Sequence, residues 1–293
     1  MTLDTFVLQL TNGLVFSLLL FLMAAGLSLI FGLMDVVNLA HGAFYLLGGY
    51  LGLSIVRWGG SFWLALLLAP LLVGVLGLLL ELTLLRRLYR RGHLDQVLAT
   101  FGVALIVADL MRAAWGAYVE VVAPPALLAG QVAIGGLAFP TYRLAVIAVG
   151  LSLALGLWLF VERSTVGMQI RAGVSDPQMA GMLGVDVPRL FAGVFAGGCA
   201  LAAFSGVAAA PILTLYPGLD SEILILALVV VVVGGLGTLR GAFFGSLIVG
   251  MADVFGKALL PEFSVFAIFV VMAAVLLTRP AGLFGRATAT RGA

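Results

Sequence analysis

Apolar stretches of about 20 residues recur along the whole chain, and short polar segments separate them. A helix needs roughly 20 apolar residues to cross about 30 Å of hydrocarbon. We therefore predict membrane helices near 10–33, 37–56, 61–84, 96–115, 142–161, 190–215, 222–239, 241–257 and 263–278. Because 63% of the 293 residues are hydrophobic and only 10% are charged, a water-soluble globule is excluded. The predicted fold class is an all-α, polytopic helical bundle that forms one transmembrane domain over residues 1–293.

The number of membrane crossings depends on two short segments. The stretches 222–239 and 241–257 are separated only around Gly237-Thr238-Leu239-Arg240. They either cross the membrane one after the other or form a re-entrant hairpin. The sequence therefore predicts eight or nine spans.

Basic residues are concentrated in three of the polar segments, and short cytoplasmic loops are enriched in Lys and Arg. We assign to the cytoplasm a loop with Arg86, Arg87, Arg90 and Arg91, a second with Arg163, Arg171 and Arg189, and a tail with Arg279, Arg286 and Arg291. This assignment places the C-terminus inside and the N-terminus outside. It also makes 116–140, which is rich in Pro and Gly, the largest external loop.

The cytoplasmic loop 162–189 is too polar to cross a membrane, yet it carries helix signals. Ser175 and Gln178 match a capping box, Pro177 suits a first helical turn, and Gly184 suits a C-terminal stop. These residues predict a short helix over about 176–183.

This short helix would carry an apolar face made of Met179, Met182 and Leu183, and Asp176 would favour its N-terminal dipole. Two interpretations are open. The helix lies on the membrane surface or packs on its own bundle, or it is a docking helix for a soluble cytoplasmic subunit.

Several functions are excluded by what the sequence lacks. There is no Gly-x-x-x-x-Gly-Lys-Ser/Thr loop, and Lys257 is the only lysine, so we expect no ATP hydrolysis by this chain. Two histidines and one cysteine, Cys199, form no metal-ligand pattern, and no nucleophile and base are suitably spaced, so we predict neither an enzyme nor a cofactor or metal site. The net charge of +2 gives no reason to expect a nucleic-acid partner. A stand-alone secondary transporter or channel would need an ion-coupling charge deep in a span, and the sequence offers no convincing one.

Three groups of residues carry a family resemblance that covers essentially the whole chain. They are Gly26-Leu27-Ser28-Leu29-Ile30-Phe31-Gly32 with Asn38-Leu39-Ala40-His41-Gly42 and Gly48-Gly49-Tyr50, then Gln178-Met179-Ala180-x-x-x-Gly184, then Gly234-Gly235-Leu236-Gly237-Thr238-Leu239-Arg240-Gly241-Ala242. The middle group looks like the coupling loop of ABC importer permeases, although the leading Glu and the downstream Ile-x-Leu-Pro are missing. In this order the groups resemble the LivH-type permease subunits of high-affinity branched-chain amino acid ABC transporters.

The resemblance implies a set of partners and a substrate class. The partners would be a second homologous permease subunit, two cytoplasmic ABC ATPase subunits, an external substrate-binding protein and the lipids of a bacterial inner (plasma) membrane. Branched-chain amino acids would be the default substrates, with urea, short amides or other amino acids as alternatives in the same family. The residues that would couple the ATPases to the bundle are Ser175, Asp176, Gln178, Met179, Ala180, Met182, Leu183 and Gly184.

The segment between the first two predicted spans supplies candidates for the substrate path. We expect Asn38, His41 and Gly42 to line this path. The alternative is structural: Asp35 would be the N-cap of the next helix with Asn38 in its first turn, and the side chain of His41 would fix helix packing.

Small residues and charge pairs at helical spacing favour structural roles. The pairs Gly48/Gly52 and Gly193/Gly197, and glycines 237, 241 and 245, would let helices approach closely. Asp109 with Arg112, and Asp253 with Lys257, would neutralise each other near a membrane edge.

Overall fold

The computed structural model describes residues 2–89, 91–259 and 261–285, and nearly all of its regular structure is helical. The predicted basic residues Arg90, Arg286 and Arg291 lie outside this part of the chain. The helices are α1 (Leu3–Met34), α2 (His41–Arg57), α3 (Phe62–Leu80), α4 (Arg86–Leu88), α5 (His93–Trp115), α6 (Thr141–Arg163), α7 (Thr165–Ser175), α8 (Pro177–Met182), α9 (Val187–Ala209), α10 (Leu219–Gly234), α11 (Leu239–Leu259) and α12 (Ser264–Thr278). A π-helical turn, Glu81–Leu85, joins α3 to α4, and 3₁₀ turns lie at Ala126–Leu128 and Pro261–Phe263.

Six helices of the described residues are long and apolar enough to cross a membrane. They are α1, α3 with its continuation to Leu88, α5, α6, α9 and α11. The shorter helices α2, α10 and α12 coincide with the other three predicted segments. The prediction of an all-α, polytopic bundle is therefore confirmed.

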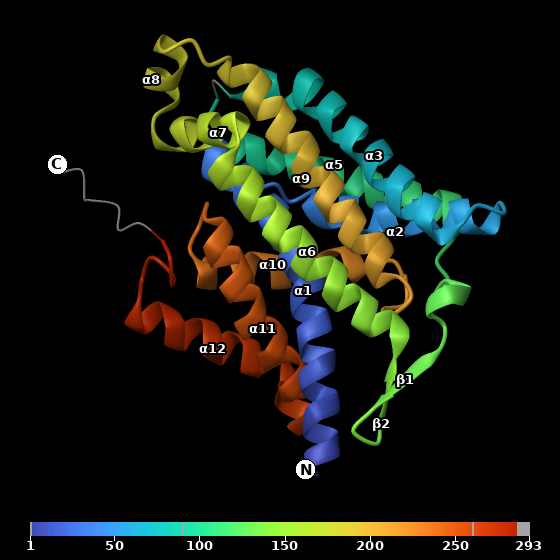
Figure 1. The fold of residues 1–293 in the computed structure, drawn as a ribbon. Coiled ribbons are helices and arrows are strands. Elements are labelled where there is room, and N and C mark those ends of the chain that lie inside the picture. The colour runs from blue at the N-terminus through green and yellow to red at the C-terminus, as the bar shows by residue number, and fades with distance from the viewer. Residues whose placement is uncertain (1, 90, 260, 286–293) are drawn as a thin grey trace.

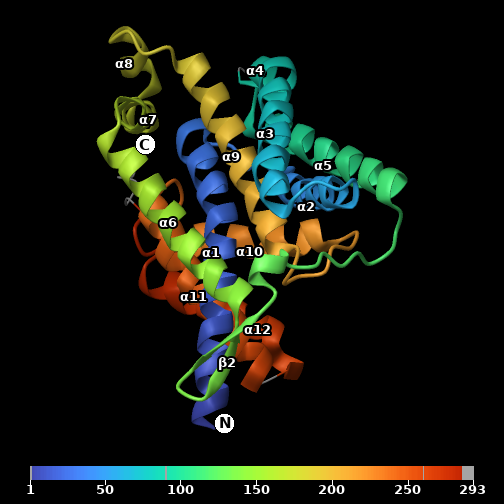
Figure 2. The ribbon, with the colours of Figure 1, turned by 45° about the vertical axis from the view of Figure 1, so that its right-hand side comes forward.

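Helix α1 runs through the middle of the bundle and contacts α6, α9, α10 and α11 (Figure 1). In the most apolar 18-residue stretch of α1, 78% of the residues are buried. The corresponding stretches of α5 and α6 are only 17% and 11% buried. Helices α5 and α6 therefore present most of their apolar surface to the surroundings. Figure 2 shows α4, α7 and α8 together at one end of the molecule, with the N-terminus and the β-hairpin at the other. We call these the α8 end and the hairpin end.

The predicted external loop 116–140 contains a β-hairpin that the sequence pattern did not reveal. Strands β1 (Gln131–Ile134) and β2 (Leu137–Pro140) pair antiparallel, with Ile134 opposite Leu137. Gly135 and Gly136 between them have φ angles of 60° and 86°, the combination that a two-residue type I′ turn requires. The turn chemistry was recognised from sequence, but the strands are only four residues each and too short to predict.

Close contacts between helices use small residues, and not always the predicted ones. A Cβ added at Gly48 would lie 2.4 Å from the Cα of Ala203, so this glycine lets α2 approach α9 as predicted. A Cβ at Gly245 would lie 2.6 Å from the carbonyl oxygen of Val230, so this glycine lets α11 approach α10. The pair Gly193/Gly197 was predicted to pack, but this is wrong because no atom of the described residues lies within 4 Å of a Cβ at either position. The contact from α9 to α1 is made one residue later, at Gly198.

The chain breaks its helical path between α1 and α2. Asp35 has a left-handed φ of 53°, and its N–H donates to the carbonyl oxygen of Phe31 over 2.8 Å, so it ends α1. The predicted N-cap role of Asp35, with Asn38 in the first turn of the next helix, is therefore wrong. The Oδ1 atom of Asn38 accepts from the N–H of Ala40 (3.1 Å), and the hydroxyl of Thr100 on α5 accepts from the N–H of Leu39 (3.2 Å). These side-chain acceptors replace the backbone partners that an unwound segment lacks.

Helices α2 and α10 both begin inside the bundle. The Nε2 atom of His41, the first residue of α2, donates to the carbonyl oxygen of Met23 in the second half of α1 (3.0 Å). From there α2 runs across the long axis of α1 in both views (Figures 1 and 2). A Cβ at Gly42 would lie 2.2 Å from the carbonyl oxygen of Asp220, in the first turn of α10. The 16 residues of α10 extend about 24 Å, less than the hydrocarbon thickness, so this helix covers only part of the depth.

Candidate functional site

The short helix predicted in the loop 162–189 is present as α8, but its N-cap differs from the prediction. Ser175 ends α7 and does not cap α8. The cap is Asp176, whose Oδ1 atom accepts from the N–H groups of Gln178 and Met179, each over 3.0 Å. The carboxylate is both a hydrogen-bond acceptor and a charge at the positive end of the helix, so it is preferred over the neighbouring hydroxyl. Pro177 occupies the first helical position, as predicted.

Helix α8 turns one small residue inward and its apolar side chains outward. Ala180 is 3% exposed, whereas Met179, Met182 and Leu183 are 54%, 81% and 78% exposed. Gly184 stops the helix with a φ of 90°, and the N–H of Val185 returns to the carbonyl oxygen of Ala180 (3.1 Å). The α8 end of the molecule thus carries an apolar face that no described residue covers. The coupling role assigned to residues 175–184 stays a prediction.

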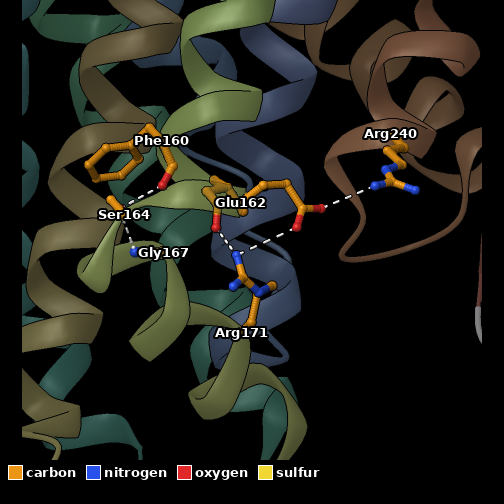
Figure 3. A network of polar contacts seen from close by, with 7 residues as sticks. Phe160, Glu162, Ser164, Gly167, Arg171 and Arg240 are labelled. Atoms are coloured by element: carbon orange, nitrogen blue, oxygen red, sulfur yellow. Dashed lines mark hydrogen bonds and ion pairs between the residues drawn. The ribbon is translucent and has the colours of Figure 1, made fainter.

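A charged network fastens α7, the helix before α8, to the bundle (Figure 3). Glu162, at the end of α6, pairs with Arg171 of α7 (3.7 Å) and with Arg240 at the start of α11 (3.3 Å). Arg171 also donates to the carbonyl oxygen of Val161, and Ser164 caps α7 by accepting from the N–H of Gly167 (2.9 Å). The network therefore joins three helices at the point where the α7–α8 segment leaves the bundle.

A cavity of about 220 Å³ lies where α2, α5 and α10 meet. Gly42 lines it from α2, Ala104 and Arg112 from α5, and Asp220 and Ser221 from α10. The first turns of α2 and α10 face each other here, so two positive helix ends lie beside the cavity. Discontinuous helices whose N-termini meet at a cavity are suited to binding the anionic group of a small substrate.

The three predicted path residues occupy different positions relative to this cavity. Gly42 lines it, while Asn38 and His41 are fully buried and do not line it. His41 uses one ring nitrogen on Met23, and its Nδ1 atom has no hydrogen-bond partner among the described residues; the same holds for Nδ2 of Asn38. A substrate-lining role for Asn38 and His41 stays a prediction, and the contacts that the structure gives their side chains are hydrogen bonds to the backbone.

Residues that the sequence assigned only to structure also lie on the cavity wall. Asp109 and Arg112 of α5 form the predicted i,i+3 pair, with Nη1 and Oδ1 3.2 Å apart, and both line the cavity. Their side chains are 76% and 55% exposed on the outer face of α5. The available signal was two opposite charges inside a predicted span, but spacing alone cannot tell a cavity wall from a membrane edge.

The turn that leads into α10 carries a further polar contact. Tyr216, in the turn before α10, donates its hydroxyl to the carboxylate of Glu222 (2.9 Å). Partial burial raises the pKa of Tyr216, and the hydrogen bond to Glu222 adds to this. The phenol therefore stays protonated and remains a donor near the start of α10.

Comparison with known proteins gives a family for this arrangement. The model of the family described as "branched-chain amino acid transport system / permease component" matches residues 9–276. The chain belongs to this family. The matched range contains all the described helices that line the cavity or form the α7–α8 segment.

Named relatives align with the permease over nearly its full length. The high-affinity branched-chain amino acid transport system permease protein BraD of Pseudomonas aeruginosa is 27% identical over 95% of both chains. The corresponding protein LivH of Escherichia coli strain K12 is 28% identical over 96% of both chains. A probable branched-chain amino acid transport permease protein of Methanocaldococcus jannaschii is 27% identical over 94% of the permease and 91% of the relative.

One solved structure resembles the permease in fold. It is PsaBC from Streptococcus pneumoniae in complex with Fab, with a TM-score of 0.50 and 16% identity over 91% of the permease and 89% of the matched chain. At this identity the likeness concerns the arrangement of the helices alone.

Proposed function

We propose that the permease forms the membrane pathway of an ATP-driven importer for branched-chain amino acids in a bacterial inner membrane. Its partners are two cytoplasmic ABC ATPases, a second homologous permease and an external substrate-binding protein. The family match and the names of the relatives support the permease role and the substrate class. The observation that carries the coupling mechanism is the exposed apolar face of α8.

The face of α8 is suited to an ATPase because it is apolar, exposed and carried by a well-capped helix. Met179, Met182 and Leu183 project from a helix whose N-cap and C-terminal stop are both satisfied. Water contact is unfavourable for exposed apolar side chains, and burying them against a partner lowers the free energy. Closure of the ATPases would push α8, and α7 would pass this displacement to α6 and α11 through Glu162.

The outer face of α5 supports a second permease subunit. Charged side chains of membrane helices almost always face protein or a water-filled cavity. Asp109 and Arg112 are more than half exposed on this face, so water or protein is a better neighbour for them than lipid. A homologous subunit placed against α5 would cover this face and close the cavity between α2, α5 and α10.

The docking role of α8 is tested by placing a charge on its most exposed residue. We expect Met182→Glu to reduce both co-purification of the ATPases and uptake of radiolabelled leucine by at least about tenfold. The reason is that burying an unpaired carboxylate in an apolar contact costs on the order of 2 kcal/mol.

Leu127→Glu is the matched control. Leu127 is also 81% exposed, but it lies in the loop 116–140. This variant should keep both activities. Normal ATPase binding and leucine uptake in Met182→Glu would contradict the docking role.

A further inference from the structure

A second polar cavity lies at the hairpin end, away from both sites described above. Its volume is about 380 Å³, and α1, α6, α11 and the segment after α9 form its walls. Gln9 and Asn12 of α1, Arg143 of α6, and Asp253 and Lys257 of α11 supply its polar groups. The proposed transport mechanism uses none of them.

The charges around this cavity do not balance. Lys257 pairs with Asp253, with Nζ and Oδ2 2.7 Å apart, and this carboxylate is only 6% exposed. Arg143 is partly buried and donates to the amide oxygen of Asn12. No carboxylate of residues 2–89, 91–259 and 261–285 forms an ion pair with Arg143. One positive charge therefore remains uncompensated beside a cavity, where an anionic group would stabilise it.

The depth of the cavity matches the edge of a membrane. About 20 residues of α1 counted back from Met34 cross the hydrocarbon, so Asn12 lies near its limit. Arg143 is in the first turn of α6 and Lys257 in the last turn of α11. Three helices thus bring their polar ends to the depth at which lipid headgroups lie.

Part of the cavity lining is apolar, which favours a lipid with a hydrocarbon tail over a soluble anion. Val15, Phe16 and Leu19 of α1, with Ile212 and Leu213, line it below the charged groups. The Nζ atom of Lys257 lies 5.8 Å from the centre of the Phe16 ring, so the cationic and apolar parts adjoin. This pattern fits an amphiphile with an anionic head and a hydrocarbon tail.

We propose that this cavity binds a phospholipid of net negative charge. The phosphate lies between Arg143 and Lys257, and the glycerol and upper acyl chains lie on Phe16 and Ile212. A soluble phosphate ligand would share only the phosphate group with such a lipid.

The test measures lipid binding to the full-length permease in detergent by native mass spectrometry. Phosphatidylglycerol, phosphatidylcholine and inorganic phosphate are titrated separately. We expect one saturable phosphatidylglycerol site, with weaker binding of phosphatidylcholine and no comparable binding of inorganic phosphate. In Arg143→Gln the phosphatidylglycerol affinity should fall about tenfold, because a charge-assisted contact is lost.

Two further variants keep the test decisive. Arg143→Lys preserves the charge and should retain most of the affinity, even if Arg143→Gln folds poorly. Arg57→Gln removes an arginine that is already paired with Glu120 and lies outside the cavity, so it should bind like the unmodified permease. Unchanged binding in a folded Arg143→Gln variant would overturn the proposal. Equal affinity for phosphatidylcholine would contradict the proposed need for a net negative charge. Equal binding of inorganic phosphate would contradict the proposal that the ligand is a lipid.

Discussion

Gly206 lies where α9 crosses α2, and its missing side chain sets the distance between the two helices. A Cβ at this position would lie 1.9 Å from the carbonyl oxygen of Tyr45. The obstacle is backbone, which cannot rotate away like a side chain. In contrast, an added Cβ at Gly197 on the same helix has no neighbour within 4 Å in the part of the chain that the structure describes. Two glycines of one helix therefore have opposite tolerance to alanine.

We expect Gly206→Ala to lower the free energy of unfolding by about 2 kcal/mol or more, because the overlap forces α2 and α9 apart. Gly197→Ala should change it by no more than about 1 kcal/mol, and toward greater stability, since alanine is the better helix former. Thermal unfolding of both variants in detergent checks the difference. Equal transition temperatures would contradict the packing role of Gly206.

At the scale of elements, α7 is the link between the exposed helix α8 and the membrane helices. Glu162 of α6 holds it by pairing with Arg171, and the same carboxylate reaches Arg240 of α11 (Figure 3). These side chains are one-third to two-thirds exposed, so each pair contributes only about 0.5 kcal/mol. The network therefore contributes little to the stability of the fold, and the role we propose for it is to transmit motion.

Glu162→Gln should reduce ATP-dependent leucine uptake about two- to fivefold while the ATPases still co-purify, because α7 loses its ionic attachment but α8 keeps its apolar face. Asp186→Asn is the control. It removes the ion pair with Arg189, which joins residues at the start of α9 only, and the asparagine can still cap that helix. A loss of ATPase binding in Glu162→Gln would show that the network supports docking and not transmission.

At the scale of the whole molecule, the cavity between α2, α5 and α10 exists because two helices begin inside the bundle. His41 fixes the start of α2 against α1, and Gly42 allows the first turn of α10 to approach. The wall on α5 then completes the cavity with a small residue, Ala104, between its larger neighbours.

Filling this cavity tests the proposed substrate path. We expect Ala104→Phe to reduce leucine uptake by about tenfold or more, since an added ring costs a bound substrate on the order of 1–3 kcal/mol in overlap. Ala148→Phe, on the exposed surface of α6, should leave uptake normal. Both variants are compared at equal membrane levels. Normal uptake in Ala104→Phe would remove this cavity from the path.

The sequence by itself determined the membrane class, the positions of the apolar helices among the described residues and the short loop helix with its exposed methionines. These features depend on local hydrophobicity and on capping residues a few positions apart, so they can be recognised along the chain. The sequence also indicated the Asp109–Arg112 and Asp253–Lys257 pairs, because i,i+3 and i,i+4 spacing places such side chains on one helix face.

Only the tertiary structure decided how these elements combine. It ended α1 at Asp35, moved the cap of α8 from Ser175 to Asp176, and replaced the predicted contacts of Gly193 and Gly197 with that of Gly198. It also brought the starts of α2 and α10 together. It left Arg143 beside a cavity, where none of the carboxylates in the described part of the chain pairs with it. Each of these outcomes depends on contacts between residues far apart in the chain, and periodicity within one helix carries no information about which neighbour each face will meet.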